Sequence, residues 1–230
     1  MNSNKKIART AGILYLVVAV FSAFSMMYVD PKFFVPGDAA TTVSNILASE
    51  WLFRLGFVSN LVAQVVFLFL VYTFYNLFKS VDKDTARLMV ILVVASVPIA
   101  FLNMLNQFAP ILLLSGSAYL SAFQPVQLQA MAMFFLEMQK AGILIVGVFW
   151  GIWLFPLGIL VVKSGFIPKW IGIFVLIAGA GYVVDSLGKF LFSNFNIVIS
   201  MFTFIGEILL ILWLLIIGVK EQKPVLKQVA

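Results

Sequence analysis

Six ionisable side chains fall inside or at the edge of long apolar stretches of this chain. They are Arg54, Glu137, Lys140, Asp185, Lys189 and Glu207. Charged groups are costly in lipid, so they usually face the interior of a helical bundle or a water-filled cavity, where they handle ions, protons or substrates, or pair with one another. We therefore look for chemistry first at these residues.

Several of the charged residues share a helical face with a residue of opposite charge. Side chains three or four positions apart are neighbours on a helix surface. The pairs with this spacing are Glu50 and Arg54, Glu137 and Lys140, and Asp185 and Lys189. A further polar patch is formed by Asn103, Asn106 and Gln107 within one apolar stretch.

The positions of these residues along their stretches predict a pocket. At about 1.5 Å of rise per residue, Glu207 lies near mid-membrane, and the other five lie between the midplane and the outer surface. We expect an outward-facing charged pocket that binds or transports a small solute or a lipid head group. Its expected lining is Arg54, Asn103, Asn106, Glu137, Lys140, Asp185, Lys189 and Glu207, with the Glu207 carboxyl as a candidate proton site.

The same residues also fit a second interpretation. They could be structural ion pairs that hold helices together in a non-catalytic membrane scaffold or accessory protein. This alternative applies most strongly to the peripheral pairs Glu50/Arg54 and Asp185/Lys189. An intramembrane enzyme is the third possibility and ranks last, because no nucleophile is paired with a base. We therefore assign no catalytic residue.

Histidine and cysteine are both absent from the 230 residues. Their absence excludes disulfides, thiol catalysis, Cys/His zinc sites and histidine-based acid–base catalysis. No phosphate loop or dinucleotide fingerprint appears. We expect no cofactor and no metal.

The composition predicts an all-α, polytopic membrane protein. The chain is 63% hydrophobic and 10% charged, whereas a soluble domain carries roughly 25% charged residues. Helices of about 17–25 residues or more can cross the hydrocarbon core, and only hydrogen-bonded helices or closed barrels survive there. We expect residues 1–230 to form a single domain with six spans, at Thr10–Val29, Trp51–Phe78, Leu88–Leu114, Phe134–Val162, Trp170–Leu187 and Ile197–Val219.

The distribution of positive charge predicts the orientation. Most of the 15 Lys and Arg residues fall at the two termini and in the second and fourth loops. The positive-inside rule therefore places both termini in the cytoplasm. Topology accounts for the net charge of +6, and no basic stripe suggests nucleic acid as a partner. The lipid bilayer is the expected partner, with a small-molecule or lipid ligand. Protein partners cannot be read from the sequence.

The longest external loop, Asp30–Glu50, contains the turn residues Pro31, Pro36 and Gly37. Asp38 can cap a short helix over Ala39–Ser49, because an aspartate side chain accepts hydrogen bonds from the free amides of a helix start. We expect this helix to lie at the outer interface and to lead into the second span.

Four blocks of the chain resemble a bacterial membrane family known as domain of unknown function 4386. These are RTAGILYLVVAV (Arg9–Val20), GDAATTVSNILASEWLFRLG (Gly37–Gly56), SGFIPKWIGIFVLIAGAGYVVDS (Ser164–Ser186) and GEILLILWLLIIGVK (Gly206–Lys220). The resemblance covers nearly the whole chain. It implies an integral protein of the bacterial cytoplasmic membrane, and it implies no activity, substrate or catalytic residue.

Overall fold

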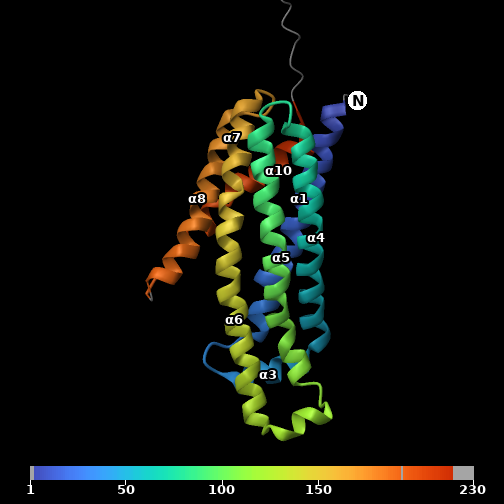
Figure 1. The fold of residues 1–230 in the computed structure, drawn as a ribbon, viewed down its shortest axis with the longest axis vertical. Helices are drawn as coiled ribbons and strands as arrows, with labels where there is room; N and C mark the ends of the chain where they lie inside the picture. The colour runs from blue at the N-terminus through green and yellow to red at the C-terminus, as the bar shows by residue number, and fades with distance from the viewer. Residues whose placement is uncertain (1–2, 193, 220–230) are drawn as a thin grey trace, which may run out of the picture.

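The computed structural model describes residues 3–192 and 194–219, which form an all-helical bundle (Figure 1). The α-helices are α1 (Ser3–Ala23), α2 (Asp30–Phe33), α3 (Ala39–Ala48), α4 (Glu50–Phe78), α5 (Lys83–Leu113), α6 (Pro125–Ile152), α7 (Leu154–Ser164), α8 (Lys169–Leu191), α9 (Ser200–Thr203) and α10 (Ile205–Ile216). A π-helix, η1 (Phe24–Val29), joins α1 to α2, and a 3₁₀ helix, η2 (Ala118–Ala122), lies between α5 and α6.

Local sequence explains where the longest helices begin and end. The Asp82 carboxylate accepts a hydrogen bond of 3.0 Å from the amide of Thr85 and caps α5. Gln124 and Gln127 form a reciprocal capping box at the start of α6. At the end of α7, Gly165 adopts a φ of 71°, a left-handed conformation that stops a helix and favours glycine.

Five helical segments are long and apolar enough to cross a membrane. They are Asn4–Phe33, Glu50–Phe78, Lys83–Leu113, Pro125–Ser164 and Lys169–Leu191. Each contains or nearly contains one of the first five spans expected from the sequence, so these five are confirmed as candidate spans. The segment expected to be the sixth is a shorter apolar helix pair over Ser200–Ile216. Six crossings therefore stay a prediction.

The long helices pack in a closed ring. α1 contacts α4, α4 contacts α5, α5 contacts α6, α6 contacts α8, α8 contacts α10, and α10 returns to α1. α7 continues beyond α6 and packs on α8 and α5. In Figure 1, α8 diverges from α6 toward its carboxyl end, where Phe190, Leu191 and Phe192 are exposed.

The backbones of α6 and α8 approach each other at two glycines. A Cβ atom on Gly179 would lie 2.7 Å from the carbonyl oxygen of Gly151, and a Cβ atom on Gly151 would lie 2.7 Å from that of Gly179. Small residues allow this approach, and helices in lipid commonly associate through such contacts. The close contact between α6 and α8 therefore depends on these two glycines.

The buried core runs along the ring and is largely aromatic near its middle. Trp153 is 3% exposed and lies against Phe67, with ring centroids 5.0 Å apart, and against Tyr15 and Phe74. Many large apolar side chains instead point outward, including Ile91, Leu102 and Leu105. An apolar outer surface suits a protein surrounded by lipid.

Both ends of the described chain lie at one end of the bundle. Gly218 lies beside Lys5 at the start of α1. The α4–α5 and α7–α8 connections lie at this same end in Figure 1, whereas α3 and the α5–α6 connection lie at the other. The lysines of the carboxyl-terminal tail lie outside the described residues, and the basic start of α1 and the two basic connections are thus grouped at one end. Their assignment to the cytoplasm stays a prediction.

Candidate functional site

A groove with a volume of about 360 Å³ lies where α3, α4 and α5 meet, at the bundle end opposite the amino terminus. Glu50 and Arg54 from α4 are its charged members. The rest of the lining is mostly apolar and comes from α3, from α5 and from the residues that follow α5: Ile46, Leu47, Phe108, Ile111, Leu112, Leu114 and Ser115.

The Arg54 guanidinium is held in place from one side. Its Nε donates to Oε1 of Glu50 at 2.6 Å, and its Cζ lies 5.6 Å from the centroid of the Phe108 ring. The side chains of Arg54 and Glu50 are 41% and 44% exposed, respectively. Within the described residues, the N–H groups on the two terminal nitrogens of Arg54 have no acceptor, so they can still bind an anion.

The α3 wall of the groove is fixed by capping and by contacts with the preceding loop. The amide and hydroxyl of Thr41 donate to Asp38 at 2.9 and 2.7 Å. These hydrogen bonds hold the pKa of the Asp38 carboxyl below its ordinary value. The buried Thr42 hydroxyl accepts from the amide of Val35 at 3.0 Å. The cap expected at Asp38 is confirmed, and α3 ends at Ala48, one residue earlier than expected.

A second polar group lies between α5 and α6. The Asn103 side chain donates to the backbone carbonyl of Gln139 at 2.9 Å and accepts from Asn106 at 3.2 Å. Gly142 leaves room for it, because a Cβ at that position would collide with the Asn103 carboxamide. Asn103 also lines a small cavity, whereas Asn106 does not line that cavity or the groove.

Glu137 and Lys140 are both exposed. They form no ion pair in the described part of the chain, although their spacing would permit one. The Lys140 ammonium instead lies 2.7 Å from the centroid of the Phe34 ring. The π face of an aromatic ring carries partial negative charge and attracts a cation, so Phe34, in the loop before α3, makes the contact to Lys140 that the spacing predicts for Glu137.

Asp185 does not pair with Lys189, and the expectation that they form an ion pair is wrong. Asp185 is 6% exposed, and its two carboxylate oxygens accept from the amides of Ile199 and Ser200, each at 2.7 Å. These amides begin α9 and need acceptors. Lys189 is exposed, and the described residues offer it no carboxylate partner.

Glu207 lies in the first turn of α10 and joins three helices. The hydroxyl of Tyr15 on α1 donates to its carboxylate, and the hydroxyl of Tyr182 on α8 is a second hydrogen-bond partner. A carboxylate near a helix start is also favoured by the helix dipole. Neither tyrosine is among the site residues predicted from the sequence. A tyrosine inside an apolar run, as in GILYLVV, does indicate a phenol that needs a hydrogen-bond partner in the core.

The predicted site residues therefore occupy several separate environments. Arg54 lines the groove, Asn103 lines the small cavity, and the remaining six line neither space. No cluster of three or more His, Cys, Asp or Glu side chains suited to a metal occurs among the described residues. The ligand-binding role of the eight residues stays a prediction.

The comparisons with known proteins identify a family. A family model described as "Domain of unknown function (DUF4386)" matches residues 10–218. The chain belongs to this family, and the resemblance seen in the sequence is confirmed. The family description assigns no activity.

One relative is an uncharacterized protein of the archaeon Archaeoglobus fulgidus. It is 47% identical over 78 residues, which are 34% of this chain and 47% of the relative. The chain thus spans about half of that relative's length. An archaeal relative does not support the bacterial origin that the resemblance implied. No solved structure matches the chain.

Proposed function

We propose that this DUF4386 protein binds an amphiphile with an anionic, phosphate-like head group in the groove formed by α3, α4 and α5. In the proposed topology of six spans with cytoplasmic termini, the groove faces the outside of a cell's cytoplasmic membrane. The observation that carries the proposal is the half-exposed Arg54 guanidinium above an apolar groove, with donors left for a ligand.

The charge chemistry favours an anion over a neutral ligand. The Arg54–Glu50 bond uses Nε, so the terminal nitrogens can present two parallel N–H groups to a phosphate. Guanidinium suits this bidentate geometry, and such charge-assisted bonds are roughly twice as strong as neutral ones. Glu50 orients the guanidinium and leaves its outer edge open.

The rest of the lining favours a ligand with an apolar portion. Ile46 is fully buried behind the groove, and Leu47 and Leu112 are about half exposed along it. A space of about 360 Å³ lies within the usual range for ligand pockets, roughly 300–1,000 Å³. It holds a head group and part of a chain, and a membrane would contain the remainder.

The proposal is tested by native mass spectrometry of the detergent-solubilised protein with lysophosphatidylglycerol. We expect Arg54→Gln to weaken binding about tenfold or more, because it removes charge-assisted hydrogen bonds. Arg87→Gln is the matched control. Arg87 also pairs with an acid on its own helix, Asp84, at 3.1 Å, and it does not line the groove.

Two further measurements make the test specific. Leu47→Trp narrows the groove without touching the charges and should also weaken lysophosphatidylglycerol binding. A neutral monoacylglycerol should bind weakly and should not distinguish wild type from Arg54→Gln. Equal binding by wild type, Arg54→Gln and Leu47→Trp, with unchanged thermal unfolding, would reject the groove as a ligand site.

The second candidate function is a membrane scaffold whose charges are structural. The two backbone amides held by Asp185 favour this role for that residue. A scaffold would show no Arg54-dependent amphiphile binding, so the same experiment separates the two functions.

A further inference from the structure

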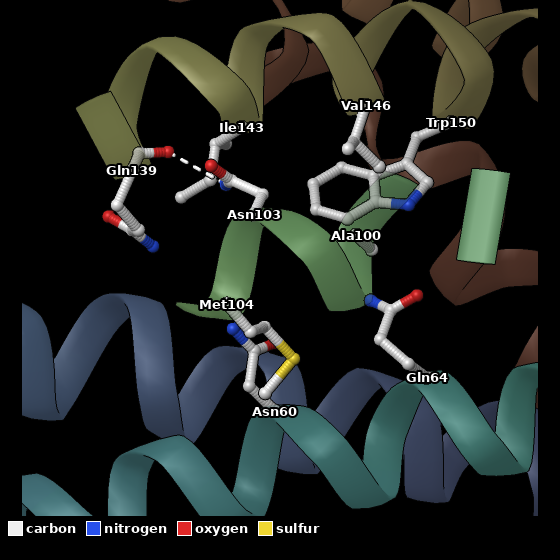
Figure 2. Close-up of a pocket in the computed structure, with 9 residues that line it drawn as sticks. All are labelled: Asn60, Gln64, Ala100, Asn103, Met104, Gln139, Ile143, Val146 and Trp150. Carbon is white, nitrogen blue, oxygen red and sulfur yellow. Dashed lines mark hydrogen bonds between the residues drawn. The ribbon is translucent and has the colours of Figure 1, made fainter. Parts of the chain in front are cut away.

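A small cavity lies between α4, α5 and α6, away from the groove. Its volume is about 20 Å³. Figure 2 shows its nine lining residues: Asn60, Gln64, Ala100, Asn103, Met104, Gln139, Ile143, Val146 and Trp150. Four of them carry carboxamides, and Trp150 adds an indole N–H.

The cavity contains hydrogen-bonding capacity that the protein does not use. Gln64 is 5% exposed, and its Oε1 has no hydrogen-bond partner among the described residues. In Figure 2, the Gln64 carboxamide on α4 and the indole nitrogen of Trp150 on α6 face the same space. The described part of the chain provides no acceptor for that indole N–H. The Gln64 oxygen is buried and Trp150 is half-buried, and buried polar groups normally have a partner.

Size and charge restrict what can occupy the cavity. One water molecule needs about 10–15 Å³ measured in this way, so the space suits a single molecule of that size and excludes a lipid chain. Every lining residue is uncharged. A cation would lose its hydration without gaining a counter-charge, which is strongly unfavourable away from water. Cavities that stay empty are apolar.

We propose that this cavity binds one water molecule, which accepts from the Trp150 indole and donates to the Gln64 carboxamide oxygen. The water links α4 to α6 across α5, at a place where the helices make no direct bond of their own. Gln64 and Trp150 give this water two polar partners, within the two to four that a buried water typically has. The site is independent of the Arg54 groove, so failure of one proposal leaves the other standing.

The first test is solid-state NMR of the protein in lipid bilayers. With ¹⁵N-indole labelling, we expect magnetisation to pass from water to the Trp150 N–H, whose signal is assigned by its loss in Trp150→Phe. Gln64→Leu should abolish the transfer, because the polar anchor is lost. Gln107→Leu is the matched control, since Gln107 is also buried with an unpartnered Oε1 but does not line the cavity.

Ala100→Val is a second variant that fills the cavity while it leaves Gln64 in place, and it should also abolish the transfer. An experimental density map should contain one peak within hydrogen-bonding distance of Gln64 and Trp150. The proposal is overturned if wild type shows no transfer, if the transfer survives in both Gln64→Leu and Ala100→Val, or if the peak has the short multiple oxygen contacts of a bound cation.

Discussion

The hydroxyl of Tyr15 on α1 donates a hydrogen bond to the carboxylate of Glu207 on α10, across a sequence separation of 192 residues. The contact joins the first and last helices of the ring. Tyr15 is itself held by edge contact with Phe74 and by Trp153, with ring centroids 5.9 and 6.0 Å away. The polar contact therefore rests on a packed aromatic core.

Removing either partner of this hydrogen bond should destabilise the bundle. A hydrogen bond contributes about 0.5–1.5 kcal/mol, and leaving one buried partner unsatisfied costs about 1–3 kcal/mol. We expect Tyr15→Phe and Glu207→Met, which removes the acceptor oxygens, each to lower the free energy of unfolding, and a double-mutant cycle to give a coupling of about 1–2 kcal/mol. The measurement is reversible unfolding in detergent micelles. Tyr28→Phe, on the exposed ring that stacks on Phe24, is the control, and zero coupling would contradict the contact.

Asp185 should matter for stability and Lys189 should not. Asp185→Ala leaves the Ile199 and Ser200 amides without their acceptor, and loss of a helix cap costs about 0.5–2 kcal/mol. Lys189→Gln alters an exposed residue and should stay within about 0.5 kcal/mol. The thermal midpoints of the two variants are the measurement. Equal losses in both would instead favour the ion pair expected from their spacing.

The contact between Asp82 and Lys163 predicts acid-sensitive stability. Lys163 donates to Asp82 at 2.7 Å and, with the amide of Thr85, holds the pKa of the Asp82 carboxyl below its ordinary value of 3.8. Because the folded-state pKa is depressed, the stabilisation is complete above the unfolded value and is lost as pH falls toward the folded pKa.

Asp82→Asn is the corresponding variant, since asparagine still caps α5 but cannot pair with Lys163. Wild type should be the more stable protein at neutral pH, and the gap should close as pH falls below 3.8. Thermal midpoints across that range check this. A gap independent of pH would mean that the ionised carboxylate contributes nothing.

Gly179→Ala should weaken the contact between α6 and α8. The added methyl group would lie 2.7 Å from the Gly151 carbonyl oxygen, and overpacking of this kind typically costs about 1–3 kcal/mol. Ala180→Val enlarges an exposed neighbour on the same helix and should be tolerated. Unfolding in detergent distinguishes them. Unchanged stability in Gly179→Ala would show that the helices can separate at no cost.

Reporter fusions at the two termini test the proposed topology. An even number of crossings places both ends on one side of the membrane, and the positive-inside rule makes that side the cytoplasm. We expect a cytoplasm-active reporter to function at either end. Activity at one end alone would mean that Ser200–Ile216 does not complete a crossing.

Local sequence was sufficient for features that depend on neighbouring residues. Of the six apolar runs expected to span the membrane, five are candidate spans, because a run of that length must bond its own backbone in lipid. The Asp38 cap follows from a carboxylate next to free helical amides. The Glu50–Arg54 pair follows from a four-residue spacing. In the cap and in the ion pair, the two partners are only three or four residues apart in the sequence.

The tertiary structure alone decided which distant groups meet. Asp185 binds the amides of Ile199 and Ser200 rather than the lysine one turn away, because those amides have no other acceptor among the described residues. Tyr15 meets Glu207 because the ring of helices closes. Helical periodicity predicts which face of each helix is polar, but it does not predict which other helix packs against that face. The cavity beside Gln64 therefore appears only once three helices pack together.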